Sequence, residues 1–246
     1  MPLSDSPRAV LLDLFNTLVP GGSQADRDCV SKQMADELGV DRDAFASLVR
    51  STFDARTRGR LGDLRETTRW MARNLGGAPS EDSIERATAL RVQLTRDLHS
   101  KTWAIPTLSA LRSGGMVLGL VSDCSAETPM IWPSTALSPY FQAVSFSCVT
   151  GHRKPEPAAY LVASDALGVE PRNCVFVGDG GSRELSGAAA LGMTAIRFLP
   201  PSFDRGEVID NDPSWAGPGI TDLFELVTFG AGAGKNAVQT GDEQGS

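Results

Sequence analysis

Residues that build disulfide frameworks and zinc clusters are scarce in this sequence. Its 246 residues include two histidines and four cysteines, and no two cysteines stand in a CxxC pair. Scattered cysteines are typical of a reducing compartment and argue against both a disulfide-stapled domain and a zinc site. We therefore expect a cytoplasmic protein. The four cysteines are Cys29, Cys124, Cys148 and Cys174.

Long apolar runs and an excess of positive charge are also missing. No apolar stretch approaches the ~20 residues of a transmembrane helix, and residues 1–8 lack the apolar region of a secretory signal. The net charge of −7 argues against a surface for nucleic acids or anionic membranes. With 41% hydrophobic and 22% charged residues, the composition is that of a soluble globular protein, and we expect its partner to be a small molecule.

Two glycine-rich stretches lack the residues that nucleotide-binding motifs require. Residues 230–235 resemble a phosphate-binding P-loop, but Phe229 replaces its first glycine and Asn236 its final Ser or Thr. Residues 178–181 lack the third glycine of a dinucleotide-binding fingerprint and follow the fourth predicted strand, not the first. We therefore reject both interpretations.

Strands and helices alternate through most of the chain. The apolar run Ala9–Leu12 predicts a strand buried on both faces of a parallel sheet. After residue 100, short apolar runs alternate with helices that proline and glycine delimit. This pattern predicts an α/β fold with a parallel, doubly wound sheet. Further strands are expected at 116–121, 143–147, 174–177 and 194–198, and helices at 105–113, 155–167, 184–191 and 220–228.

Residues 21–100 differ in character from the rest. A Gly-Gly-Ser sequence at 21–23 predicts a hinge, and the segment after it is rich in Arg, Asp, Glu, Ala and Leu. We expect a small helical module inserted into a core of residues 8–20 and 101–229. The tail 230–246 lacks apolar content and is expected to be disordered. The helices of the insert are predicted at 25–38, 42–58, 63–75 and 81–100.

Polar side chains follow four of the predicted strands. Asp13 directly follows the first strand and Ser122 the second. Lys154 follows the third and Asp179 the fourth. Because ligands bind where the carboxyl ends of parallel strands meet, we expect these side chains to share one site. Two carboxylates there would repel each other, so the site is expected to hold Mg²⁺, which binds through carboxylates and phosphate oxygens.

Each of these residues has a chemical role and an ordinary alternative. Lys154 supplies a positive charge for a bound anion, and Ser122 supplies a hydroxyl donor. Glu184, one short loop after Asp179, is placed to orient water molecules on the metal. Asp13 is a candidate nucleophile that forms an aspartyl-phosphate, with metal and lysine offsetting the transferred charge. Each residue alone could be an ordinary turn cap or surface charge. Such roles explain less readily why polar residues occur at four successive strand ends.

Four segments of the chain resemble the ordered motifs of haloacid dehalogenase-like hydrolases. The resemblance covers about residues 8–200 and implies a Rossmann-like core with a helical cap inserted between the first two motifs. From the glycine-bounded insertion we also expect residues 21–100 to form a helical cap that moves against the core. The four motifs are Asp13–Leu18, Leu120–Asp123, Arg153–Pro157 and Val177–Glu184.

The resemblance assigns roles to residues within these motifs. Asp13 is the implied nucleophile, and Ser122 and Lys154 hold the anion. Asp179 ligates magnesium together with Asp13, and the backbone carbonyl of Phe15 is a further metal ligand. The metal set is completed by Glu184, and the remaining predicted substrate contacts are Asn16, Thr17 and Asp123.

One position departs from the family pattern. Phosphatases of this family usually carry a second Asp two residues after the nucleophile, but here that position is Phe15, which cannot transfer a proton. The dehalogenase branch also has an aromatic residue there and needs no metal. Asp179 and Glu184 resemble the metal-using branch. We favour a Mg²⁺-dependent phosphate-ester hydrolase, with a 2-haloacid dehalogenase as the alternative. A third possibility is a binding or regulatory protein with little turnover.

The insert carries an arginine-rich stretch. Most of these arginines are expected to form a solvated helix face. One or two near the turn at 59–62 are candidates to reach over the site and hold an anionic substrate. Cys124, two residues after Ser122, is expected to fill space in a loop or the core, since no base that would activate it is evident. The arginines are Arg50, Arg56, Arg58, Arg60, Arg65, Arg69 and Arg73.

Overall fold

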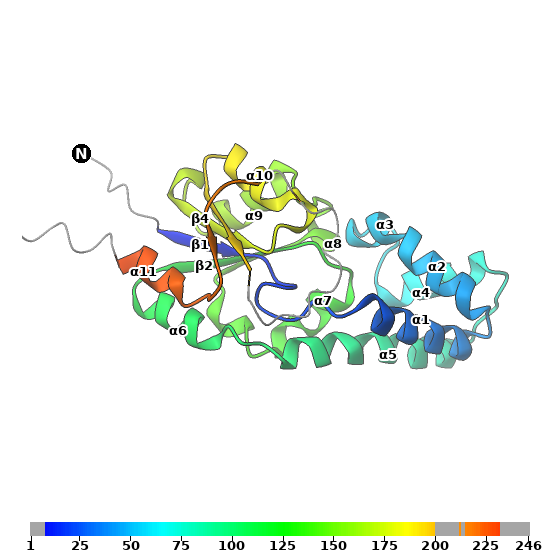
Figure 1. The fold of residues 1–246 in the computed structure, drawn as a ribbon. Coiled ribbons are helices and arrows are strands. Elements are labelled where there is room, and N and C mark those ends of the chain that lie inside the picture. The colour runs from blue at the N-terminus through cyan, green and yellow to red at the C-terminus, as the bar shows by residue number, and fades with distance from the viewer. Residues whose placement is uncertain (1–7, 200–211, 213–214, 232–246) are drawn as a thin grey trace, which may run out of the picture.

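A six-stranded sheet forms the centre of the molecule, which we describe from a computed structural model for residues 8–199, 212 and 215–231 (Figure 1). All neighbouring strands are parallel, in the order β3-β2-β1-β4-β5-β6. This confirms the predicted α/β fold. The strands are β1 (Ala9–Leu12), β2 (Val117–Ser122), β3 (Ala143–Phe146), β4 (Cys174–Gly178), β5 (Thr194–Phe198) and β6 (Gly219–Ile220).

Burial on both faces explains why β1 lies inside the sheet. Its residues alternate between two hydrophobic cores, with Val10 and Leu12 in one and Ala9 and Leu11 in the other. The helices cover both faces: α6 and α11 lie on one side and α9 and α10 on the other (Figure 1). The apolar run before Asp13 therefore needs no polar alternation. These helices are α6 (Ile105–Ser113), α9 (Pro157–Ala166), α10 (Glu184–Ala190) and α11 (Glu225–Ala231).

The helices between residues 24 and 100, here called the helical segment, form a separate cluster at the end of the sheet (Figure 1). They enclose their own core, which includes Phe45, Met71 and Ile84. Side-chain caps fix several of their starts; the Asp41 carboxylate, for example, accepts from the Ala44 N–H at 2.8 Å. The helices are α1 (Gln24–Leu38), α2 (Arg42–Ser51), α3 (Phe53–Thr57), α4 (Leu64–Asn74) and α5 (Glu81–Ser100).

The predicted helix 42–58 is divided into two, α2 and α3. Thr52 separates them with φ −93° and ψ 10°, outside the ordinary helical region. Its hydroxyl donates to the carbonyl of Leu48 at 2.6 Å, a local bond that competes with a regular helix. The single helix was therefore wrong, although both halves are helical.

The predicted helix 220–228 is wrong over its first turn. Ile220 is buried and pairs with β5 as part of β6. Helix α11 begins only at Glu225, whose carboxylate accepts from the N–H groups of Thr221 and Asp222, both at 3.0 Å. The chain needs these capping contacts before it can turn into a helix. Residues 230 and 231 of the predicted tail belong to α11, and residues 232–246 lie outside the described part.

Short elements near the sheet edge were not predicted. Ser147, the expected last residue of a strand, instead begins helix α8, and α9 starts at Pro157 rather than at residue 155. Helix ends vary by a residue or two with definition, so the shift of α9 is minor. The added elements are α7 (Glu127–Ile131), α8 (Ser147–Thr150) and 3₁₀ turns at Trp132–Ser134, Ser138–Tyr140, Pro171–Asn173 and Gly181–Arg183.

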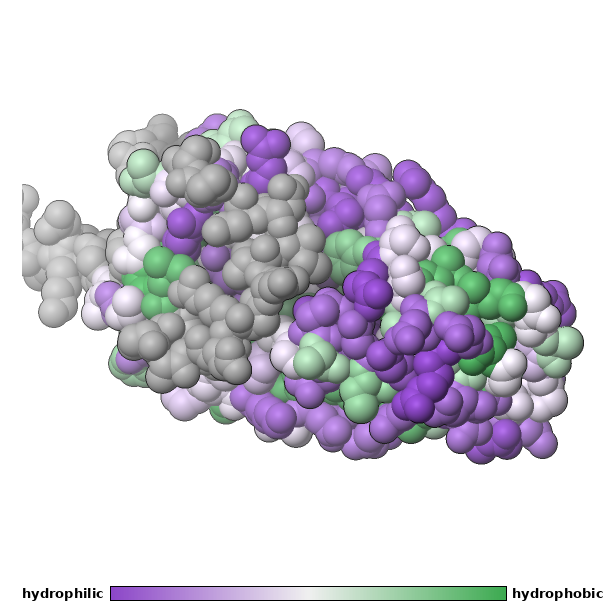
Figure 2. All heavy atoms as spheres, turned by 45° about the vertical axis from the view of Figure 1, so that its right-hand side comes forward, coloured by the Kyte–Doolittle hydropathy of each residue, from purple (hydrophilic) through white to green (hydrophobic). Residues whose placement is uncertain are grey.

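The surface of the helical segment is mixed in character. Figure 2 turns this end forward and shows an area of hydrophobic residues among hydrophilic ones. Within the described residues, no helix combines the length and apolar character needed to cross a bilayer.

Candidate active site

A tight loop after β1 places Asp13 at the carboxyl edge of the sheet. The Asp13 N–H donates to the carbonyl of Val177 at 2.9 Å, so the chain is still tied to β4 there. The loop then closes on itself, because the Asn16 N–H donates to the carbonyl of Val19 at 2.7 Å. Asn16 has a φ of 60°, a left-handed conformation that asparagine tolerates better than most residues. The Asp13 side chain is left buried, with 6% exposed.

Lys154 joins two of the predicted site carboxylates. Its ammonium donates to Asp13 Oδ1, to Glu184 Oε2 at 2.6 Å and to the carbonyl of Val121 at 3.3 Å. Three acceptors therefore satisfy its three donors, which a buried ammonium requires. Burial alone would lower the pKa of Lys154, but the charges of Asp13 and Glu184 outweigh it and raise that pKa. Lys154 is held as a cation.

The loop after β4 fixes Asp179 and Glu184. Asp179 Oδ1 accepts from the Gly181 N–H at 2.8 Å, and its Oδ2 accepts from the Asn16 side chain at 3.0 Å. Glu184 Oε1 accepts from the Gly180 N–H at 2.9 Å. A Cβ on Gly178 would lie 2.0 Å from Glu184 Oε1, so only glycine lets this carboxylate reach the site.

The three carboxylates could together bind a cation. Oxygen atoms of Asp13, Asp179 and Glu184 all lie within 4.8 Å of one another, and all three residues are buried. Burial raises the pKa of Asp13 to about 6, with the charge of Lys154 opposing and that of Asp179 adding to the shift. Burial likewise raises the pKa of Glu184. When all three are ionised, three carboxylates against one ammonium leave two negative charges, and this hard-oxygen set fits a divalent cation such as Mg²⁺.

The other predicted substrate contacts differ in their freedom to bind a ligand. Ser122 ends β2, and its buried hydroxyl has no hydrogen-bond partner among the described residues. The Thr17 hydroxyl donates to Asp13 Oδ2 at 3.2 Å. Asp123 accepts from the Lys154 N–H at 3.0 Å and lies 3.5 Å from the Arg153 guanidinium. The buried Ser122 hydroxyl thus has an unused donor, whereas Thr17 and Asp123 hold other site residues.

A cavity of about 490 Å³ separates this sheet edge from the helical segment. Its floor consists of the strand-end residues, and the Phe15 ring also lines it. Behind Phe15 lies His99 of α5, with ring centroids 6.0 Å apart. The floor residues are Asp13, Asn16, Asp123, Lys154, Asp179 and Glu184, and the basic residues that line the cavity from the helical segment are Arg27, Arg50, Arg56 and Arg91.

The arginines next to the turn at 59–62 do not line this cavity. Arg58 contacts Asp54 at 2.9 Å and Glu156 at 2.5 Å, and Arg60 lies 3.3 Å from Asp54. Arg56, one turn earlier, does line the cavity. The arginines of the predicted stretch that line the cavity are therefore Arg50 and Arg56, not those next to the turn.

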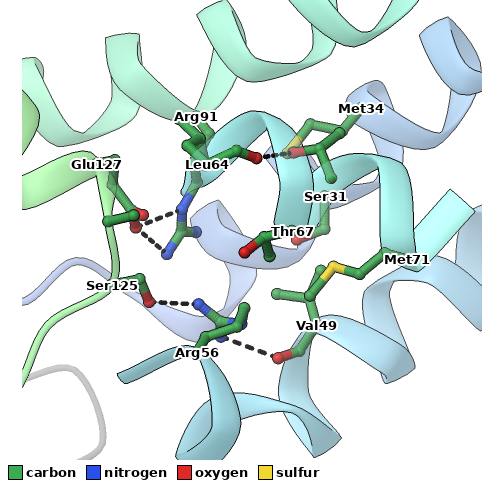
Figure 3. A pocket seen from close by; sticks show the side chains of 12 residues that line it. Ser31, Met34, Val49, Arg56, Leu64, Thr67, Met71, Arg91, Ser125 and Glu127 are labelled. Carbon is green, nitrogen blue, oxygen red and sulfur yellow. Dashed lines mark hydrogen bonds and ion pairs between the residues drawn. The ribbon is translucent and has the colours of Figure 1, made fainter. Parts of the chain in front are cut away.

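Arg56 is an arginine without an acidic partner. It donates to the Ser125 hydroxyl at 2.5 Å and to the carbonyl of Val49 at 2.9 Å, and no described carboxylate lies within ion-pair distance (Figure 3). Neighbouring Arg91 instead pairs with Glu127 at 2.8 Å. Burial, with the charge of Arg91, lowers the pKa of Arg56 to about 10. At neutral pH the guanidinium stays charged and faces the cavity unpaired.

The sequence analysis missed the contribution of Arg91 and Glu127. Glu127 lies five residues after Ser122, the same separation that links Glu184 to Asp179. An acid one short loop beyond a strand end was therefore the signal that could have found it. Arg91 offered no comparable signal, because it lies in the middle of a long amphipathic helix.

Comparison with known proteins identifies the family. The model of the haloacid dehalogenase-like hydrolases matches residues 7–192. The chain belongs to this family. The structural and sequence relatives of this hydrolase include both phosphatases and a dehalogenase.

Two curated relatives of the hydrolase are phosphatases. A glyceraldehyde 3-phosphate phosphatase from Methanopyrus kandleri is 30% identical over 142 residues, which cover 56% of this chain and 58% of the relative. A phosphoglycolate phosphatase from Shigella boydii serotype 4 is 27% identical over 169 residues, 63% of this chain and 66% of the relative. The matched part thus spans less than two thirds of either relative.

A solved structure from the dehalogenase branch shares the fold of the hydrolase. The 2-haloacid dehalogenase from Pseudomonas syringae pv. tomato superposes with a TM-score of 0.66 at 21% identity. The superposition covers 92% of this chain and 98% of that one. At this identity the similarity establishes the architecture alone.

Proposed function

We propose that this hydrolase is a Mg²⁺-dependent phosphatase of small phosphate esters that works through an aspartyl-phosphate on Asp13. The observation that carries the proposal is the buried cluster of Asp13, Asp179 and Glu184, whose charge exceeds that of Lys154. A dehalogenase that needs no metal would have little use for this excess. The phosphatase names of the curated relatives support the same choice.

The metal would be held by Asp13, Asp179, Glu184 and the backbone carbonyl of Phe15. Bound there, Mg²⁺ offsets negative charge on the phosphoryl group and so favours its transfer. Lys154, which donates to both Asp13 and Glu184, contributes a fixed cation next to the nucleophile. The unpaired Ser122 hydroxyl is free to donate to a phosphoryl oxygen.

The chemistry runs in two displacements at phosphorus. One Asp13 oxygen forms a bond to phosphorus while the bond from phosphorus to the ester oxygen breaks and its electron pair leaves with the alcohol. Water then displaces the Asp13 carboxylate and releases inorganic phosphate. Thr17 and Lys154 hold the two oxygens of Asp13 in a fixed orientation during the attack.

Phe15 restricts which esters react well. An alkoxide leaving group needs a proton, and Phe15 cannot supply one. We therefore expect turnover to depend steeply on leaving-group acidity, so that aryl or acyl phosphates react faster than sugar phosphates.

Arg56 restricts the other end of the substrate. An unpaired guanidinium that faces a cavity is a suitable partner for a carboxylate or a second phosphate. We propose that the substrate carries such an anionic group toward the helical segment, while its phosphoryl group lies at Asp13.

Residues 21–100 would act as the cap over this site. Its two connections to the core run together, because the Thr102 hydroxyl donates to the carbonyl of Leu18 at 2.8 Å. Contacts between cap and core, such as the 2.8 Å pair of Arg91 and Glu127, would break and reform as it opens. Closure excludes water and brings Arg56 over the floor.

Parallel product assays test the proposal. Phosphate release from p-nitrophenyl phosphate and phosphoglycolate and halide release from 2-chloropropionate are measured with and without EDTA. We expect phosphate release that EDTA abolishes. The aromatic Phe15 favours the dehalogenase as the second candidate, and halide release that survives EDTA with no phosphate from any ester would establish it instead. Absence of both products would favour a binding protein.

A further inference from the structure

Two cysteines far apart in the sequence lie next to each other beside the cavity. The sulfurs of Cys124 and Cys148 are 3.9 Å apart, and both thiols are free. Cys124 follows β2 and Cys148 follows β3, and these strands are parallel neighbours, with Ser122 opposite Phe146. The two chains therefore leave the sheet side by side. A further hydrogen bond holds the two segments together, because the Cys124 N–H donates to the Ser147 hydroxyl at 3.0 Å.

The two thiols differ in exposure and acidity. Cys124 is buried, with 3% exposed, whereas Cys148 is partly exposed. A hydrogen bond from the Cys124 thiol lowers the pKa of Cys148, and burial raises that of Cys124. Since the thiolate is the reactive form, an oxidant should meet Cys148 first.

We propose that Cys148 is a peroxide-reactive modification site and that Cys124 resolves the product into a reversible disulfide that slows the hydrolase. The Cys148 thiolate attacks a hydroperoxide, forming a sulfenic acid as the O–O bond breaks and water or an alcohol leaves. The Cys124 sulfur then attacks the Cys148 sulfur, and the S–O bond breaks with release of water. The two thiols lose two electrons in total, and the peroxide gains them.

The disulfide would strain the residues that hold the substrate. A disulfide needs sulfurs about 2.05 Å apart, so the two must approach by about 1.9 Å. On one side of Cys124 lies Asp123, which accepts from the Lys154 N–H. On its other side lies Ser125, which accepts from Arg56. A displacement of Cys124 would therefore disturb both the Asp123 contact with Lys154 and the Ser125 contact with Arg56.

The helical segment also packs closely against one of the two cysteines, Cys148. Gly59, in the turn after α3, lies so close to Cys148 that a Cβ there would be 2.1 Å from its carbonyl oxygen. A shift of Cys148 would therefore displace the point where α3 meets the core. Since a misplacement of about 1 Å can cost about 100-fold in rate, we expect turnover to fall by about that factor.

The test treats the reduced, full-length protein with hydrogen peroxide. Free-thiol titration and non-reducing peptide mass spectrometry follow the cysteines, and product release is measured before oxidation, after it, and after dithiothreitol. We expect loss of two of the four thiols, a linked Cys124–Cys148 peptide and a loss of rate that dithiothreitol reverses. Cys148→Ser and Cys124→Ala should resist inactivation, whereas Cys29→Ser, which removes an exposed cysteine elsewhere, should not.

Two results would overturn the proposal. One is oxidation of Cys148 to a sulfinic acid without a linked peptide, and the other is a linked peptide with unchanged turnover. The thiol and mass measurements need no particular substrate, and the rate is followed with whichever product, phosphate or halide, the reduced enzyme releases. Failure of the phosphatase assignment is therefore seen in the reduced enzyme, separately from any effect of oxidation.

Discussion

The floor of the cavity and its roof, which is the part of the helical segment that lines the cavity, carry opposite charges. On the floor, three buried carboxylates gather around one ammonium at the carboxyl edge of the sheet. On the roof, helices present arginines, of which Arg50 and Arg91 pair with acids and Arg56 does not. The floor has an excess of negative charge and the roof has an unpaired positive charge.

This difference separates the chemistry from the selection of the substrate. A buried carboxylate cluster is stable only with its partners, so few substitutions on the floor are tolerated. In the proposed arrangement the roof would contact a part of the substrate that does not react, so its residues could vary without loss of the reaction. Five experiments test that separation.

Removing the nucleophile should have the largest effect. Asp13→Asn takes away the oxygen that would attack phosphorus, so phosphate release should fall below detection on every ester. Asp28→Asn, which changes a carboxylate lining the cavity from the roof, is the matched control and should keep most of the rate. Equal losses in both variants would contradict the division between floor and roof.

Metal binding should depend on the floor alone. Calorimetric titration with magnesium should show a specific site in the wild type that Asp179→Ala lacks, because one of three clustered carboxylates is gone. Asp165→Ala, at an exposed position on α9, should bind like the wild type. If Asp179→Ala bound magnesium as well as the wild type, the metal assignment would be wrong.

Adding a proton donor to the floor should increase the turnover of esters with poor leaving groups. Phe15→Asp places a carboxylate two residues after Asp13 and should raise the turnover of alkyl phosphates by up to ~10²-fold, with little change for aryl phosphates. The new group would face His99, whose ring lies 6.0 Å from that of Phe15. Phosphate release from a matched alkyl and aryl series measures the effect, and equal gains on both would argue against proton donation.

Loss of the unpaired arginine should change selectivity. Arg56→Met should reduce kcat/KM for phosphoglycolate by about 10- to 100-fold, because a hydrogen-bonded charge contact typically contributes about 1.5–3 kcal/mol. Phosphate release from p-nitrophenyl phosphate, which has no second anionic group, should change little. Arg60→Met removes an exposed arginine outside the cavity and serves as the control. A uniform loss on both substrates would place Arg56 with the chemistry instead.

The contact between His99 of α5 and Phe15 of the floor should make the stability of the protein depend on pH. His99 is 5% exposed, and burial lowers its pKa from 6.5 to about 4. The unfolded chain takes up the proton at higher pH than the folded one, so stability falls as pH drops from 6.5 towards 4.

Urea unfolding measures this effect. Between about pH 7.5 and about pH 5.5 the wild type should lose about 1.3 kcal/mol more than His99→Leu. A parallel pH dependence in the two proteins would show that His99 is not the responsive group.

The sequence predicted the floor well because its signals are local. Asp13 and Asp179 directly follow apolar strands and Ser122 ends one, and parallel pairing brings such ends together whatever the rest of the chain does. The insert was visible for a similar reason, since its helices have their own caps and glycine boundaries. The division at Thr52 was not, because a local hydroxyl bond there opposes a pattern that otherwise continues.

The roof could not be predicted in the same way. Whether an arginine is paired depends on acids from distant parts of the chain: Arg58 meets Glu156, whereas among the described residues Arg56 hydrogen-bonds to the Ser125 hydroxyl and the Val49 carbonyl and forms no ion pair. The contact of Cys124 with Cys148 likewise depends on the neighbouring positions of β2 and β3. Such contacts depend on the tertiary structure and produce no recognisable pattern in the sequence.

Helix α5 is long enough that it would act as a lever if the helical segment moved against the core. Its 20 residues extend about 30 Å at 1.5 Å per residue, and His99 in its last turn touches the ring of Phe15. A rotation of about 5° around that end would carry Glu81 through about 2.5 Å but Arg91 through only about half as far. A small rotation at the base would thus be magnified at the far tip, whereas the α5 residues that line the cavity, from Arg91 to Leu98, would move least.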